Sequence, residues 1–82
     1  MQNRNWREFV HSDPEVLVGK PVVKGTRLSV DFLLKLFGAG WTREEVLENY
    51  PTLSEAALSA VFAFAAECIQ EDSLYLIKRH VA

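Results

Sequence analysis

The sequence predicts a small, mostly α-helical domain in which a short N-terminal β-hairpin precedes a core of three helices. Its length of 82 residues allows one hydrophobic core, and the 49% of hydrophobic residues is ample for a globular fold. From residue 29 onwards, apolar residues recur at the spacing of amphipathic helices. We therefore expect a single domain over residues 1–82, with its core at 9–71 and a tail at 72–82.

Extended segments and turns are expected before the helices. Residues 8–11 are predicted as an edge strand, and the Ser-Asp-Pro at 12–14 has the chemistry of a turn. Residues 21–23 and 26–28 are predicted as the two arms of a hairpin around Gly25, which supplies the positive φ that such turns need. Arms this short are not stable alone, so we expect them to lie on the helices that follow.

The first predicted helix begins at Ser29. This residue is a good N-cap, and Asp31 lies in the first turn, where the helix dipole favours a negative charge. The Gly-Ala-Gly at 38–40 is typical of a glycine C-cap and ends the helix. The inward stripe, spaced i, i+3, i+4 and i+7, consists of Val30, Leu33, Leu34 and Phe37.

The second predicted helix has the best local signature in the chain. Thr42 and Glu45 form a capping box, and Trp41 with Val46 occupies the hydrophobic-staple positions around it. Pro51 ends the helix. The side chains expected to face inward are Val46, Leu47 and Tyr50.

The third predicted helix runs over residues 54–70, with Ser54 or Thr52 as its N-cap. Twelve of its seventeen residues are apolar. A helix that is apolar around most of its circumference is usually buried on more than one side. Its predicted core stripe consists of Leu58, Val61, Phe62, Ala65 and Ile69, flanked by Ala57, Phe64 and Cys68.

We expect this third helix to form a homodimer interface. A chain of this length buries only about 60–65% of its unfolded surface, and two short helices cannot cover so apolar a third. The alternative is a helix that is simply central in the monomer. The expected interface residues are Ala56, Ser59, Ala63, Phe64 and Ala66.

Charge is divided unevenly along the chain. Residues 1–43 hold seven Lys or Arg against four acids, whereas residues 44–77 hold seven acids and no basic residue. Lys20, Lys24 and Arg27 lie within eight residues with no acid among them, and on a protruding hairpin they are expected to contact DNA phosphates. The alternatives are contact with an acidic face of a partner protein, a solvated hairpin, and a charge division without function.

Little in the sequence indicates catalysis or a cofactor. The glycines do not form a phosphate-binding loop, and His11 and His80 have no ligand-spaced neighbours, so we expect no metal, no cofactor and no small-molecule substrate. The lone Cys68 lies on an apolar helix face and is expected in the core rather than as a nucleophile. No apolar run is long enough to span a membrane. The start of the chain lacks a signal peptide, so we expect a cytoplasmic protein.

The order of the three helices resembles a helix-turn-helix, in which the third helix would read DNA. Its first residues, Ser-Glu-Ala-Ala at 54–57, offer no Arg, Lys, Asn or Gln to base edges, and the surrounding region is acidic. If the protein binds DNA, we expect it to use the basic segment instead.

Several motifs together resemble a known bacterial family. The stretch GKPVVKGTRLSV at 19–30, preceded by Asp-Pro at 13–14, resembles the opening signature of domain of unknown function 433. AGWT at 39–42, EEVL at 44–47, the Tyr-Pro-x-Leu at 50–53 and the alanine-rich 60–66 continue it, so the resemblance covers about 9–67. Ser29 stands where relatives often carry Pro, a mild departure since both suit a helix start.

The resemblance implies a fold and a function. Family members are similar to winged or homeodomain-like helix-turn-helix proteins, and some, paired with PIN-like ribonuclease toxins, are described as VapB-like antitoxins. We therefore expect a non-enzymatic dimeric regulator that binds a PIN-like toxin protein, with operator DNA as a second ligand. The alternative is a protein–protein interaction module with no nucleic-acid role. The tail is expected to contact the partner through Leu74, Tyr75, Ile77, Lys78 and Arg79.

Overall fold

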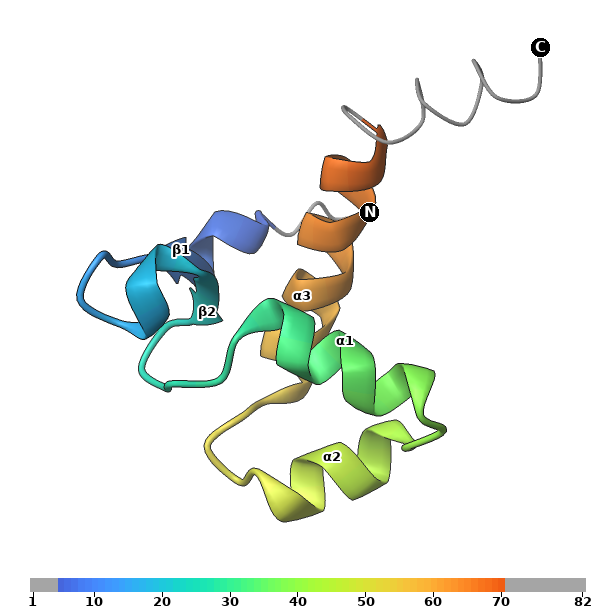
Figure 1. The fold of residues 1–82 in the computed structure, drawn as a ribbon. Coiled ribbons are helices and arrows are strands. Elements are labelled where there is room, and N and C mark those ends of the chain that lie inside the picture. Colours follow the sequence, from blue (N-terminus) through green and yellow to red (C-terminus); the bar gives the residue numbers. More distant parts are fainter. Residues whose placement is uncertain (1–4, 71–82) are drawn as a thin grey trace, which may run out of the picture.

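The computed structural model describes residues 5–70 of the chain. It confirms a mostly helical domain with three α-helices and a two-stranded antiparallel hairpin near the N-terminus (Figure 1). The elements are, in order, η1 (Trp6–Glu8), β1 (Val10–Ser12), η2 (Leu17–Gly19), β2 (Pro21–Val23), α1 (Val30–Gly38), α2 (Arg43–Asn49) and α3 (Glu55–Cys68), where η denotes a 3₁₀ helix.

The hairpin pairs different strands from those predicted. β2 forms its two-stranded sheet with β1, in the register Val10 with Val23, and residues 26–28 are not a strand of it. The predicted strand at 8–11 is also displaced, because Glu8 ends η1 and β1 continues to Ser12. Val10 and Val23 are each 3% exposed, so this pairing buries two β-branched side chains against the helices.

The turn expected at Gly25 is present although its second arm is not a strand. Gly25 has a φ of +81°, and the Thr26 hydroxyl donates to the Val23 carbonyl oxygen at 2.8 Å. Of the predicted pairing, one backbone hydrogen bond is present, from the Val23 N–H to the Leu28 carbonyl oxygen at 3.0 Å, and it is followed by an isolated bridge between Val22 and Ser29. The turn therefore leads directly into the N-cap of α1.

The ends of α1 agree with the prediction. The Phe32 backbone N–H donates to the Ser29 hydroxyl at 3.2 Å, which is the expected N-cap bond. At the other end, Gly40 has a φ of +101°, and the Trp41 N–H donates to the Leu36 carbonyl at 3.1 Å. This is the Schellman arrangement. Of the predicted inward stripe, Val30 and Leu33 are buried, and Leu34 and Phe37 are half-buried against the core.

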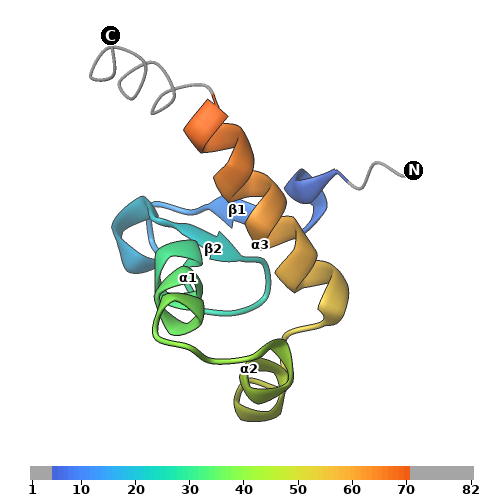
Figure 2. The same cartoon turned by 90° about the vertical axis from the view of Figure 1, so that its right-hand side faces the viewer.

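The capping box of α2 is also confirmed. The Glu45 N–H donates to the Thr42 hydroxyl at 3.1 Å, and the Thr42 N–H donates to a Glu45 carboxylate oxygen at 2.8 Å. Val46 is fully buried, and Trp41 packs on the same core from the staple position. In both Figure 1 and Figure 2, α2 lies at the end of the domain opposite to the C-terminal end of α3.

The inward face of α3 is rotated from the predicted stripe. Ser54 is its N-cap, since the Ala57 N–H donates to the Ser54 hydroxyl at 3.0 Å. Leu58 and Val61 are fully buried as expected, but Phe62 and Ile69 are 38% and 52% exposed. The rotation follows from η1 and β1, which pack on α3 beside Phe64 and draw that side of the helix inward. The buried residues of α3 are Ala57, Leu58, Ala60 and Val61.

The core lies where α1, α2, α3 and the two strands meet, with Leu33, Val46, Leu58, Val61 and Val22 as its largest fully buried side chains. Among residues 5–70, no helix combines the length and apolar character that crossing a membrane requires.

Candidate partner-binding surfaces

The predicted basic segment is exposed but not uniformly charged. Lys20 precedes β2, Lys24 lies in the turn after it, and Arg27 lies in the segment that leads to α1. Lys20 Nζ is 3.5 Å from an Asp31 carboxylate oxygen, so this lysine already has an acidic neighbour. Among the described residues, Lys24 and Arg27 make no ion pair. The phosphate-binding potential of the segment therefore rests mainly on Lys24 and Arg27.

Asp31 interacts both with Ser29, the N-cap residue of α1, and with Lys20 of the basic segment. The hydrogen bond from the Ser29 side chain, and then the charge of Lys20, lower the pKa of the Asp31 carboxyl below its ordinary value of 3.8. Asp31 is one residue beyond the acid-free stretch that predicted a basic surface. The sequence predicts Asp31 only as a first-turn acid, because its pairing with Lys20 depends on how β2 meets α1.

A left-handed turn precedes the basic segment and was missed in the sequence. Leu17, Val18 and Gly19 have φ values of +52°, +57° and +82°. Glycine adopts this region freely, whereas a β-branched residue such as Val18 rarely does. Val18 is also 94% exposed, so its side chain contributes almost nothing to the core. Neither residue type in the Leu-Val dipeptide at 17–18 predicts a left-handed conformation.

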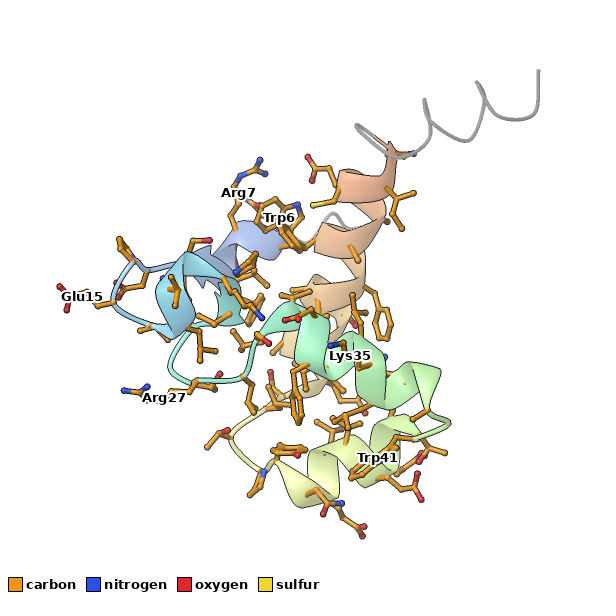
Figure 3. All side chains as sticks on the ribbon, viewed as in Figure 1. Trp6, Arg7, Glu15, Arg27, Lys35 and Trp41 are labelled. Atoms are coloured by element: carbon orange, nitrogen blue, oxygen red, sulfur yellow. The ribbon has the colours of Figure 1, made fainter. Side chains whose placement is uncertain are left out.

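An open hollow of about 320 Å³ lies beside this turn. Leu17 and Phe32, each 38% exposed, contribute apolar walls, and Arg27 is the basic residue among those that line the hollow. The rings of Phe32 and Tyr50 meet in a T-shaped arrangement with their centroids 5.8 Å apart, which holds the Phe32 wall in place. In Figure 3, the labelled Arg27 side chain extends away from the body of the protein. The remaining lining residues are Leu28 and Ser29.

A second hollow, of about 350 Å³, lies between β2, the first half of α1 and the C-terminal part of α3. Its lining is almost entirely apolar, with the Lys20 and Asp31 pair among the lining residues. Cys68 lines this hollow and is exposed, so its predicted place in the core is wrong. The cause is the rotation of α3 described above. The apolar lining residues are Pro21, Val30, Leu34, Phe64, Ala65 and Ile69.

The predicted dimer residues do not all lie on one face of α3. Ser59, Ala63 and Ala66 are exposed along its outer side, and Ala56 is half-buried at the edge. Phe64 lies on the other side, where its ring meets that of Trp6 edge-to-face with centroids 4.8 Å apart. The exposed aromatic residue near the outer face is Phe62, which rests against Phe37.

The labelled Trp6 in Figure 3 joins the N-terminal segment to α3. Besides its contact with Phe64, its indole N–H donates to the Glu67 carboxylate. The Arg7 guanidinium lies over the same indole ring, 4.3 Å from the centroid. Trp6 therefore anchors the N-terminal segment to α3. Its contact with Phe64 lies on the side of α3 away from the outer face.

The first turn of α3 is occupied by an ion pair. Arg43 Nη2 on α2 is 2.7 Å from a Glu55 carboxylate oxygen. A recognition helix would need donors at this end to reach base edges, and here an acid is held in place instead. The expectation that α3 does not read DNA stays a prediction.

Other predicted features fall partly outside the described structure. His11 is exposed on β1, and within residues 5–70 no three His, Cys, Asp or Glu side chains gather closely enough to hold a metal ion. The predicted partner-binding residues of the tail, together with His80, lie outside the described residues. These are Leu74, Tyr75, Ile77, Lys78 and Arg79.

Comparison with known proteins places this chain in a family. Its residues 10–65 match the family model described as Protein of unknown function (DUF433). The uncharacterized protein y4eO of Sinorhizobium fredii is 39% identical over 61 residues, which make up 72% of this chain and 28% of that protein. The chain therefore spans a little over a quarter of the length of this relative.

A solved structure shares the fold. The crystal structure of a DUF433 member protein from Anabaena variabilis matches with a TM-score of 0.67 at 23% sequence identity, over 89% of this chain and 68% of that one. The predicted resemblance is thus confirmed for the family and not for any particular activity. Since the family model covers well over half of its residues, the chain belongs to the DUF433 family.

Proposed function

We propose that this protein is a non-enzymatic, antitoxin-like regulator that works as a homodimer and binds a PIN-like ribonuclease toxin. The observation that carries the proposal is the set of large apolar side chains exposed on so small a domain. Exposed apolar patches are typical of protein–protein interaction sites. The identity of the partner rests on the resemblance of the sequence motifs to VapB-like antitoxins. The exposed apolar side chains are Leu17, Val18, Phe32, Phe62 and Ile69.

The proposed dimer uses the outer face of α3. Ser59, Ala63 and Ala66 are exposed there without a charged residue among them, and Phe62 borders them with 38% of its surface exposed. Small side chains let two helices approach closely, and the exposed ring adds apolar area to the contact. The face is available for a second copy because η1, β1 and the core occupy the opposite side.

Replacing Ala63 by Glu tests the dimer. A carboxylate in the middle of the face would lose its hydration without gaining a partner, so we expect a monomer by sedimentation equilibrium. The exposed position leaves the isolated fold intact, which circular dichroism checks. Ala39→Glu, at an exposed position between α1 and α2, is the matched control. Equal dimerisation of the two variants would place the interface elsewhere.

The proposed toxin binding is tested in the native cells. The tagged protein is recovered after nuclease treatment, and its partners are identified by mass spectrometry. We expect a small PIN-like ribonuclease whose activity the added protein inhibits. Deleting residues 73–82 is expected to weaken this capture, since the tail carries the predicted contact residues. Recovery of the protein alone would favour the self-associating module.

Operator DNA is a second candidate ligand, because Lys24 and Arg27 are exposed and make no ion pair among residues 5–70. Phosphate contacts predict a log–log salt slope of about one per contact, and a dimer doubles the number of cations. Replacing Lys20, Lys24 and Arg27 by Ala is expected to abolish duplex binding, whereas Lys35→Ala on α1 leaves it unchanged. Binding that survives the triple replacement would remove DNA from this segment.

A further inference from the structure

The left-handed turn at Leu17 and Val18 carries a strained conformation that the fold does not use for packing. Left-handed backbone is uncommon for residues other than Gly, Asn and Asp, and a β-branched residue there is an outlier. Both residues have φ values above +50°, yet Val18 is 94% exposed. Strain of this kind is concentrated at functional sites. The conformation holds an apolar side chain out in water.

The turn is continuous with the 320 Å³ hollow next to it. Leu17 belongs to both, and the Phe32 and Leu28 side chains supply further apolar surface. The hollow lies at the small end of the range of about 300–1,000 Å³ typical of ligand pockets. Because the hollow is open to solvent and the exposed Val18 directly follows its lining residue Leu17, the shape suits a bulky side chain of a protein segment lying across the surface.

The one charged residue among those that line the hollow is basic. Arg27 lines it, and Lys24 is exposed in the neighbouring turn. Residues 19–30 contain no acid, and Asp31 is paired with Lys20. Arginine forms forked hydrogen bonds with carboxylates. An acidic group is therefore the complementary neighbour for an apolar side chain seated in this hollow.

We propose that the turn and hollow, defined by Leu17, Val18, Arg27 and Phe32, form a docking site for a partner-protein segment. In that segment a bulky apolar side chain lies next to Asp or Glu. The proposal deepens the protein-binding function proposed above and rests on it. A DNA backbone would satisfy Arg27 and Lys24, but it would leave Leu17, Val18 and Phe32 facing a polar surface. The acidic, apolar segment accounts for both the charge and the exposed apolar side chains.

Amide chemical shifts of the full 82-residue protein, labelled with nitrogen-15, test this proposal. The probe is a synthetic peptide with a central Phe flanked by two Glu, compared with versions in which Phe becomes Ala or both Glu become Gln. We expect the first peptide to shift the amides of Leu17, Val18, Arg27 and Phe32 at millimolar concentration, and each altered peptide to bind several-fold more weakly. A short duplex DNA is titrated in parallel.

Two protein variants complete the experiment. Val18→Gly keeps the turn, since glycine accepts a positive φ, and it is expected to bind the peptide about tenfold more weakly. That estimate corresponds to partial burial of the three-carbon side chain, equivalent to between one and two methylene-sized groups at roughly a factor of four in affinity each. Arg27→Ala is expected to remove the preference for Glu over Gln. Ile69→Ala and Lys35→Ala, away from this site, are the matched controls and leave binding unchanged.

The outcomes separate this site from the proposed function as a whole. If the peptide shifts none of these amides, or if Val18→Gly binds as well as the unaltered protein, the docking site is wrong. If only the duplex shifts Arg27 and Lys24, the surface serves phosphate. A toxin captured equally well by the Val18→Gly variant would overturn the site and leave the antitoxin proposal standing.

Discussion

Replacing Val18 by Gly is expected to stabilise the protein, although such a change usually destabilises. A left-handed conformation costs roughly 1–2 kcal/mol for a residue with a Cβ atom. Glycine avoids this cost but adds about 0.5–1 kcal/mol of unfolded-state entropy. Because Val18 is 94% exposed, little packing is lost. The net expected gain is about 0.5–1 kcal/mol.

The converse change at Gly25 provides the matched comparison. Gly25 has a φ of +81°, and a Cβ atom built there meets nothing within 4 Å, so Gly25→Ala introduces conformational strain without a clash. The same two terms then act in the opposite direction, and we expect a loss of about 0.5–1 kcal/mol. The two variants isolate backbone strain from packing at two exposed turns of the same domain.

Thermal and urea unfolding followed by circular dichroism measure both effects. In a domain of this size, 1 kcal/mol corresponds to roughly 4–8 °C in melting temperature. We therefore expect Val18→Gly to melt several degrees above the unaltered protein and Gly25→Ala several degrees below it. A Val18→Gly variant that is less stable than the unaltered protein would refute the reasoning, because it would mean that Val18 is not held in a strained conformation.

Three further changes have expected outcomes. Thr42→Ala removes the acceptor of the capping-box bond and should lower the free energy of unfolding by about 1 kcal/mol, read as a lower urea midpoint with unchanged m-value. Leu58→Ala empties a fully buried site and should cost about 2–5 kcal/mol, enough to unfold much of the population at 37 °C. The pKa of Asp31 is lowered by its Ser29 bond and by Lys20. The stabilisation from its ionised form is therefore present above pH 3.8, its ordinary pKa, and is lost as the pH falls through the lower folded pKa. Asp31→Asn should make stability less dependent on pH in that acidic range, and an unaltered pH profile would contradict this.

The helix ends show what could be predicted from the sequence. The caps at Ser29, Thr42 and Ser54 each use a side chain that bonds to a backbone N–H three residues away. Such bonds need no tertiary partner, so the residue types and their spacing predict them. The Gly40 turn after α1 is of the same kind, since its bonds reach back no further than five residues to Leu36.

Less of the candidate surfaces could be predicted from the sequence. Lys24 and Arg27 were predicted to be exposed and are exposed, but the pairing of Lys20 with Asp31 joins residues eleven apart. Exposure of Phe62 and Ile69 depends on the rotation of α3, which helical periodicity cannot define in so apolar a helix. Its core-facing and solvent-facing sides both consist of apolar residues.

The three α-helices of residues 5–70, their N-caps, the turn at Gly25 and the family could be predicted from the sequence, because each depends on local bonds or on motifs read along the chain. The tertiary structure alone decided that β2 pairs with β1, that Phe64 packs on Trp6, and that Leu17 and Val18 adopt a left-handed turn. A three-residue strand carries too little pattern to choose its partner. That choice is made by which pairing buries Val10 and Val23 against the helices, and this energy exists only once distant segments have met.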